Sequence, residues 1–149
     1  MINTILVIDD NTLDNAILRN TLYNEHYNII YALTSHEALA LLESRNVDLI
    51  LIDMVMPVMD SFLNEFSKMK YYHTIPVIMI TSTDKTDIIE KMIGNFEIFD
   101  YIIKPFDNIK SLDNINHLIF VNKIRTAISY RKAVRELTEL KNKNEGDGR

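Results

Sequence analysis

Five short aliphatic runs recur along the chain, and each is followed by polar residues typical of turns. The first run, 5–8, ends at Asp9-Asp10-Asn11, as expected for a strand that is buried on both faces. Each interval between runs is long enough to hold a helix. The pattern therefore predicts five strands alternating with helices, the strands covering 5–8, 29–31, 49–52, 77–80 and 101–103.

The first two intervals carry apolar residues at helical spacing. Asn11 or Thr12 is expected to cap the first helix, and Ser35 the second. Regular alternation of strands and helices predicts a parallel sheet covered on both faces and joined by right-handed crossovers. The fold class expected is doubly wound α/β. The inward residues expected are Leu13, Ile17, Leu18 and Leu22 in the first helix, and Ala38, Leu41 and Leu42 in the second.

The last third of the chain predicts a long helix, since no Pro or Gly interrupts it between Asp107 and Gly146. Its first part is expected to pack on the sheet through one apolar face, and its second part to project past the domain. Both a coiled coil and a frayed amphipathic helix stay open for the second part, because fewer than three heptads are visible. The two apolar sets are Ile109, Leu112, Ile115, Leu118 and Ile119, then Ala127, Tyr130, Val134 and Leu137.

Composition limits the classes of function. The 149 residues fit one ordinary domain, and no apolar run is long enough to cross a bilayer. A net charge of -5 disfavours binding of nucleic acid or anionic membranes. Without cysteines the chain has no disulfides or thiolate metal sites, and its four histidines lack ligand spacing. The N-terminus shows no secretory signal, so a cytoplasmic location is expected.

Chemistry-bearing residues follow four of the predicted strands. In doubly wound sheets, ligands bind outside the carboxyl ends of the strands. Those ends carry Asp9 and Asp10, Asp53, Thr81 and Lys104. The predicted rim therefore holds three carboxylates, one hydroxyl and one ammonium group.

Three neighbouring carboxylates repel one another unless a cation lies between them. Mg²⁺ suits such a site, because it prefers oxygen ligands and is often held by one or two carboxylates together with a phosphate. An aspartate such as Asp53 can attack phosphorus to form an aspartyl-phosphate. Lys104 would then neutralise phosphoryl charge, while Thr81 would donate a hydrogen bond.

Residues 3 to 125 resemble the receiver domains of response regulators in two-component signal transduction. The ordered set of motifs carries the resemblance, whereas the aspartate pair alone would be weak. These motifs are Asp9-Asp10, Asp53-Met54-Val55-Met56-Pro57-Val58-Met59-Asp60, Thr81-Ser82 and Lys104-Pro105-Phe106.

The resemblance implies a flavodoxin-like sheet of strand order 2-1-3-4-5 and a phosphoacceptor role for Asp53. It also implies Asp10, Asp53 and the Val55 carbonyl as direct Mg²⁺ ligands, with Asp9 acting through water. Thr81 and Tyr101 would be the switch residues, and the Lys104-Pro105 peptide would be cis.

The partner implied is a sensor histidine kinase or phosphotransfer protein. A homodimer would use either the face of the fourth helix, fifth strand and fifth helix, or the C-terminal helix. The resemblance implies a signalling domain rather than an enzyme, beyond self-catalysed phosphoryl transfer and dephosphorylation. Residues 1–125 are expected to form the receiver, and 126–149 a helical extension and polar tail, either a linker to an output domain or the end of a single-domain regulator.

Some positions depart from the family pattern. Ser61 stands where Gly is usual, which removes an easy positive φ angle. The stretch Gly94–Glu97 replaces small residues, so the output face is expected to be atypical. Val55 and Thr83 resemble the positions that tune phosphoryl lifetime.

Other functions fit less well. Asp9, Asp10 and Asn11 alone could end a strand and cap a helix. A haloacid dehalogenase phosphatase needs a second aspartate where Val55 stands, and a flavodoxin needs a glycine- and hydroxyl-rich loop after the first strand. A pseudo-receiver that only docks partners is the main alternative. The C-terminal helix also resembles linkers to diguanylate cyclase, cyclic-di-GMP phosphodiesterase or histidine-kinase modules.

Overall fold

The computed structural model describes residues 2–54, 59–81, 86–103 and 115–147. Its five strands form one parallel sheet in the order β2-β1-β3-β4-β5. The prediction of a doubly wound α/β fold with this strand order is confirmed. The strands are β1 (Thr4–Ile8), β2 (Asn28–Ala32), β3 (Leu49–Asp53), β4 (Val77–Thr81) and β5 (Asp100–Ile103).

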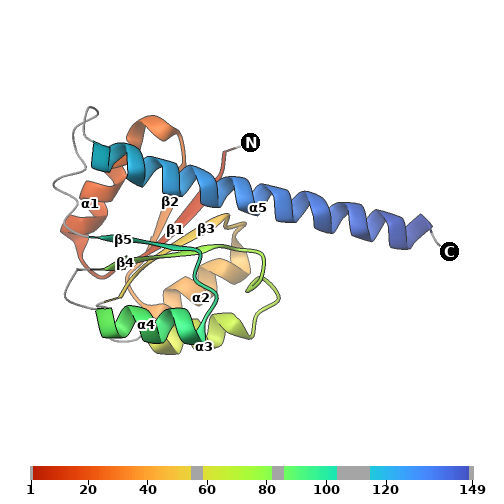
Figure 1. The fold of residues 1–149 in the computed structure, drawn as a ribbon, viewed down its shortest axis with the longest axis horizontal. Helices are drawn as coiled ribbons and strands as arrows, with labels where there is room; N and C mark the ends of the chain where they lie inside the picture. Colours follow the sequence, from red (N-terminus) through yellow and green to blue (C-terminus); the bar gives the residue numbers. More distant parts are fainter. Residues whose placement is uncertain (1, 55–58, 82–85, 104–114, 148–149) are drawn as a thin grey trace.

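Helices cover both faces of the sheet (Figure 1). One face is covered by α1 (Thr12–Thr21) and α5 (Ile115–Asp147). The other is covered by α2 (Ser35–Ser44), α3 (Met59–Ser67) and α4 (Thr86–Asn95). A short 3-10 helix, η1 (Tyr23–Glu25), lies between α1 and β2.

Alternate residues of each central strand enter two separate cores. In β1, Leu6 and Ile8 pack with α2 and α3, whereas Ile5 and Val7 pack with α1 and α5. All four side chains are fully buried. Because side chains alternate between the two faces of a strand, a sheet covered on both faces needs apolar residues at every position. This explains the uninterrupted aliphatic runs.

The residue that caps α2 lies one position before the predicted cap, Ser35. Thr34, not Ser35, is the N-cap: its hydroxyl accepts a hydrogen bond from the Glu37 N–H at 3.1 Å. The Glu37 carboxylate accepts one from the Leu33 N–H, also at 3.1 Å. Thr34 has the extended backbone that a cap requires, and Ser35 already belongs to the first turn. The cap prediction was therefore wrong by one residue.

The face of α5 that packs on the sheet also differs from the prediction. Ile115, Leu118 and Ile119 are 66%, 55% and 48% exposed. A second apolar stripe is buried instead; it continues in phase for more than two turns and contains the large ring of Phe120. Ile109 and Leu112 lie outside the described residues. The buried stripe comprises Phe120, Val121, Ile124, Ala127 and Ile128.

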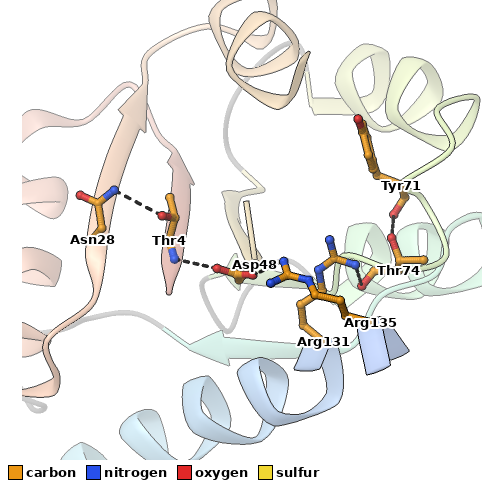
Figure 2. Close-up of polar contacts among 7 residues, drawn as sticks. All are labelled: Thr4, Asn28, Asp48, Tyr71, Thr74, Arg131 and Arg135. Carbon is orange, nitrogen blue, oxygen red and sulfur yellow. Dashed lines mark hydrogen bonds and ion pairs between the residues drawn. The ribbon is translucent and has the colours of Figure 1, made fainter. Parts of the chain in front are cut away.

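Two arginines attach the later part of α5 to the edge of the sheet where β1 and β3 begin (Figure 2). Asp53 lies at the opposite edge, where β3 ends. Arg135 Nη2 lies 2.8 Å from Asp48 Oδ1, and Asp48 Oδ2 accepts the Thr4 N–H at 2.9 Å. Arg131 Nη1 donates to the Thr74 carbonyl at 3.3 Å. The helix therefore continues unbroken past residue 125, the proposed end of the receiver, and is held by contacts as far as Arg135. We call these contacts of Arg131 and Arg135 the arginine clamp.

Burial affects the charges of the clamp. Burial lowers the pKa of the Arg131 guanidinium, and the positive charge of Arg135 lowers it further. Asp48 and Tyr71 raise this pKa, but their effect is smaller. The Asp48 side chain is only 8% exposed. A buried carboxylate of this kind requires paired partners, and the clamp provides them.

Replacement of Asp48 by Asn should lower the free energy of unfolding by about 1–2 kcal/mol, because Arg135 loses its anionic partner. Glu65→Gln is the matched control: the Lys68–Glu65 pair is 73% and 57% exposed, and its loss should change stability by less than about 0.5 kcal/mol. Urea unfolding followed by circular dichroism measures both. Equal effects of the two substitutions would contradict a stabilising clamp.

Candidate functional site

The central strands bring residues distant in sequence to one edge of the sheet. Ile8 of β1 pairs in register with Ile52 of β3, and Asp53 pairs with Ile80 of β4. Because all three strands are parallel, the residues that end them or follow them are neighbours.

Three carboxylates meet at this edge. Asp9, Asp10 and Asp53 each offer an oxygen, and these oxygens lie within 4.8 Å of one another. Asp9 is 1% exposed and Asp53 is 3% exposed, whereas Asp10 is exposed to solvent. We call this group the acidic pocket. It is buried at its base and open at Asp10.

Local hydrogen bonds hold Asp9 in place. Its N–H donates to the Ala32 carbonyl at 3.2 Å, and its Oδ1 accepts the Asn11 N–H at 2.9 Å. Asn15 Nδ2 donates to the Asp9 carbonyl at 3.1 Å. Asp9 thus stabilises the turn before α1, which is the role it would have in an ordinary turn without a bound ligand. It also contributes an oxygen to the acidic pocket.

A hydroxyl at the end of β4 and an aromatic ring near the start of the neighbouring strand β5 line one pocket. Thr81 ends β4 and is fully buried. Between α4 and β5 lies an open pocket of about 400 Å³, with Thr81, Ile89, Tyr101 and Ile103 among its lining residues. Tyr101 is 39% exposed. One cavity therefore connects Thr81 with Tyr101.

Lys123 of α5 holds Tyr101 from the solvent side. Its Nζ lies 4.8 Å from the centre of the Tyr101 ring and donates to the Tyr101 carbonyl at 2.7 Å. It also pairs with Asp100 Oδ1 at 3.1 Å. Sequence reasoning missed this contact, because no local pattern pairs Lys123 with a tyrosine 22 residues earlier in the chain.

Several residues expected at the site fall outside the described residues. These are Val55, expected to provide a carbonyl ligand, Lys104, expected to neutralise phosphoryl charge, and Pro105. The described part of the site therefore comprises Asp9, Asp10, Asp53, Thr81 and Tyr101.

Comparison with known families agrees with this arrangement. A model of the response regulator receiver domain matches residues 5–116. The chain belongs to the response regulator receiver family. Receiver domains of this family act in two-component signal transduction, and they serve signalling rather than catalysis.

The chain is similar to the transcriptional regulatory protein CpxR of Klebsiella pneumoniae, with 32% identity over 107 residues. It is also similar to the regulatory protein VanR of Enterococcus faecium, with 33% identity over 107 residues. Each alignment covers 71% of this chain, but 44% of CpxR and 45% of VanR. The chain thus spans about half the length of the curated relatives it matches.

Among solved structures, the signal receiver domain of an HD domain-containing protein from Pseudomonas fluorescens Pf-5 resembles this chain. The TM-score is 0.74 at 26% sequence identity, and the match covers 90% of this chain and 92% of that one.

Within the described residues, no helix is long and apolar enough to cross a membrane.

Mutual repulsion in the acidic pocket predicts that its charges destabilise the metal-free protein. Asp10→Asn should raise the urea midpoint in EDTA at low salt, because one of three neighbouring negative charges is removed. The increase should shrink in 0.5 M NaCl, since Asp10 is exposed to screening. Asp87→Asn, which removes an exposed charge in the first turn of α4, is the control. A lower midpoint for Asp10→Asn would contradict this account of the pocket.

Loss of Lys123 should release the Tyr101 ring. In Lys123→Met, the aromatic NMR signals of Tyr101 should move toward averaged values, because both the hydrogen bond to its carbonyl and the charge over its ring are lost. Lys132→Met, on the exposed side of the same helix, should leave those signals unchanged. Unaltered Tyr101 signals in Lys123→Met would show that Lys123 does not hold the ring.

Proposed function

We propose that Asp53 is the phosphoacceptor of this receiver. The observation that supports this most directly is the position of Asp53. It ends the central strand β3, is almost fully buried, and lies within the acidic pocket beside Asp9 and Asp10. A carboxylate held in this way has few rotamers and presents an oxygen to the strand-end rim, the orientation that a nucleophile needs.

The donor set fits Mg²⁺. All three groups are hard oxygen ligands, two of them are buried, and their repulsion is relieved by a divalent cation. On the family pattern, Asp10 and Asp53 would bind the ion directly with the Val55 carbonyl, and Asp9 would act through water. When bound, the ion would neutralise charge on the transferred phosphoryl group.

The donor in this proposal is a phosphohistidine of a sensor histidine kinase or a phosphotransfer protein. An oxygen of Asp53 forms the new P–O bond while the P–N bond to imidazole breaks, and the imidazole takes a proton from solvent and leaves as neutral histidine. Lys104 would pair with a phosphoryl oxygen, and Thr81 would donate its hydroxyl hydrogen to another. A cis Lys104-Pro105 peptide would orient the lysine. Later hydrolysis of the acyl phosphate would reset Asp53.

Signalling is proposed to pass from Thr81 to Tyr101. Movement of Thr81 toward the phosphoryl group would open the pocket that both residues line, and the Tyr101 ring would turn inward from its place beneath Lys123. The face of α4, β5 and α5 would then change shape. We propose that this face, in the cytoplasm, controls an output module joined through α5.

The test is intact-mass analysis after incubation with acetyl phosphate and Mg²⁺. Wild type should gain one phosphoryl group, of about 80 Da by the chemistry of phosphoryl transfer, whereas Asp53→Asn and an EDTA-treated sample should gain none. Asp60→Asn, which changes an exposed aspartate paired with Lys91, should be phosphorylated like wild type.

Absence of an adduct in folded wild type, with phosphohistidine donors as well as acetyl phosphate, would overturn the proposal. It would support the alternative function, a pseudo-receiver that docks partners without phosphorylation. An adduct that persists in Asp53→Asn would instead place the phosphoryl group on a different residue.

A further inference from the structure

A small polar pocket lies beside the arginine clamp, at the edge of the sheet opposite Asp53. Its volume is about 160 Å³. Residues from the end of α2, from the loops before β3 and β4, and from α5 line it. We call it the clamp pocket. Its polar lining residues are Glu43, Ser44, Arg45, Asn46, Tyr71 and Arg131.

The hydrogen bonds of Arg131 are incomplete at this pocket. Its Nη1 donates to the Thr74 carbonyl at 3.3 Å (Figure 2), but its Nε is buried and has no hydrogen-bond partner. Among the side chains that the structure describes, this is the one buried nitrogen without an acceptor. An unpaired N–H of a buried charged group is costly, so native structures usually supply an acceptor for it.

The charge of Arg131 is also unbalanced. Asp48 pairs with Arg135 at 2.8 Å, and no carboxylate of the described residues forms an ion pair with Arg131. Arg45 brings a second guanidinium to the same pocket. Burial and the charge of Arg135 lower the pKa of Arg131, as expected for a cation that lacks sufficient compensation. An anion beside Arg131 would supply both the missing acceptor and the missing charge.

Two features of the pocket act against an anion. Glu43 is one of the lining residues, and α2 ends here at Ser44, so the negative end of its dipole lies close by. Both effects are reduced. Glu43 is exposed to solvent, which screens its charge, and the Leu41 carbonyl of α2 already accepts the Arg45 N–H at 2.8 Å. Two guanidinium groups therefore outweigh one screened carboxylate.

We infer that the clamp pocket binds a small oxyanion, a phosphate or a carboxylate, through Arg131 and Arg45. The planar guanidinium group can donate two N–H groups to one oxyanion, a geometry that lysine cannot reproduce. The volume lies below the range of about 300–1,000 Å³ that is usual for larger organic ligands, so a single small ion fits best. The inference does not depend on phosphorylation of Asp53, because the two sites lie at opposite edges of the sheet.

Arginine side-chain NMR tests the site directly, because the Nε–H of Arg131 has its own ¹H–¹⁵N signal. Inorganic phosphate and sodium acetate are titrated separately into ¹⁵N-labelled protein, at constant pH and with sodium chloride keeping the ionic strength constant. EDTA is present throughout, so that no divalent cation can hold phosphate at the acidic pocket. Either ion should shift the Arg131 Nε–H saturably, together with the amides of residues 44–46.

The two titrations distinguish the possible ions. A response to phosphate alone would identify a phosphate site, and equal responses would identify a site for oxyanions in general. An Arg131 Nε–H signal that neither ion changes would mean that water is its acceptor, and would overturn the inference. Shifts centred on Asp9 and Asp53 would overturn it as well.

Substitution of Arg131 separates geometry from charge. Arg131→Lys keeps the positive charge but removes the planar donor group, and should weaken binding of the ion at least about tenfold. Lys132→Gln removes a charge from the exposed neighbour, and should change the affinity by less than about twofold. The amide shifts of Arg45 and Asn46 report binding in each variant. Equal loss in the two variants would show nonspecific attraction and contradict the inference.

Glu43→Gln provides a test in the opposite direction. Because it removes a like charge from beside the bound anion, it should strengthen binding several-fold. Glu43 is exposed, so this variant should remain folded even if Arg131→Lys is unstable, which circular dichroism of each variant checks. Weaker binding in Glu43→Gln would overturn the inference.

Discussion

Parallel pairing of β1, β3 and β4 is the constraint on which the rest of the structure depends. It aligns the carboxyl ends of three buried strands, so Asp9, Asp53 and Thr81 become neighbours although more than 70 residues separate the first from the last. The same pairing needs helices on both faces and apolar residues at nearly every strand position. The fold therefore gathers three carboxylates at one edge, while the interior of the three central strands is apolar.

The arginine clamp holds α5 against the opposite edge of the sheet. Asp48 precedes β3 and Asp53 ends it, so one strand connects the arginine clamp with the acidic pocket over about 17 Å. Between these two edges, α5 contacts β5 through Lys123. One helix thus lies against the proposed switch residue Tyr101, is clamped at the far edge, and continues beyond the domain (Figure 1).

Much of the fold could be predicted from the sequence, because strands buried on both faces leave uninterrupted aliphatic runs. Asp9, Asp10, Asp53 and Thr81 each end or follow one of those runs. This was enough to predict that they lie at the same edge of the sheet. The packing face of α5 could not be predicted in this way. The helix carries two apolar stripes, and only tertiary contacts decide that Phe120 and Ile124 are buried while Ile115 and Leu118 are exposed.

The polar contacts between residues far apart in the sequence could not be predicted from the sequence either. The pairing of Arg135 with Asp48 joins residues 87 positions apart, and no local pattern marks it. Lys123 over Tyr101 is similar, since a lysine on an amphipathic helix is usually a solvated charge. The positions of Val55 and Lys104 lie outside the described residues and remain predictions.

The acidic pocket at the carboxyl edge of the sheet is proposed to bind a divalent cation. Titration of ¹⁵N-labelled protein with Mg²⁺, followed by amide NMR shifts, tests it most directly. The account predicts saturable shifts at Asp9, Asp10, Asp53 and Thr81, and little change at Asp48 and Thr74 on the opposite edge. The absence of shifts at millimolar Mg²⁺, or shifts centred away from these aspartates, would contradict the claim.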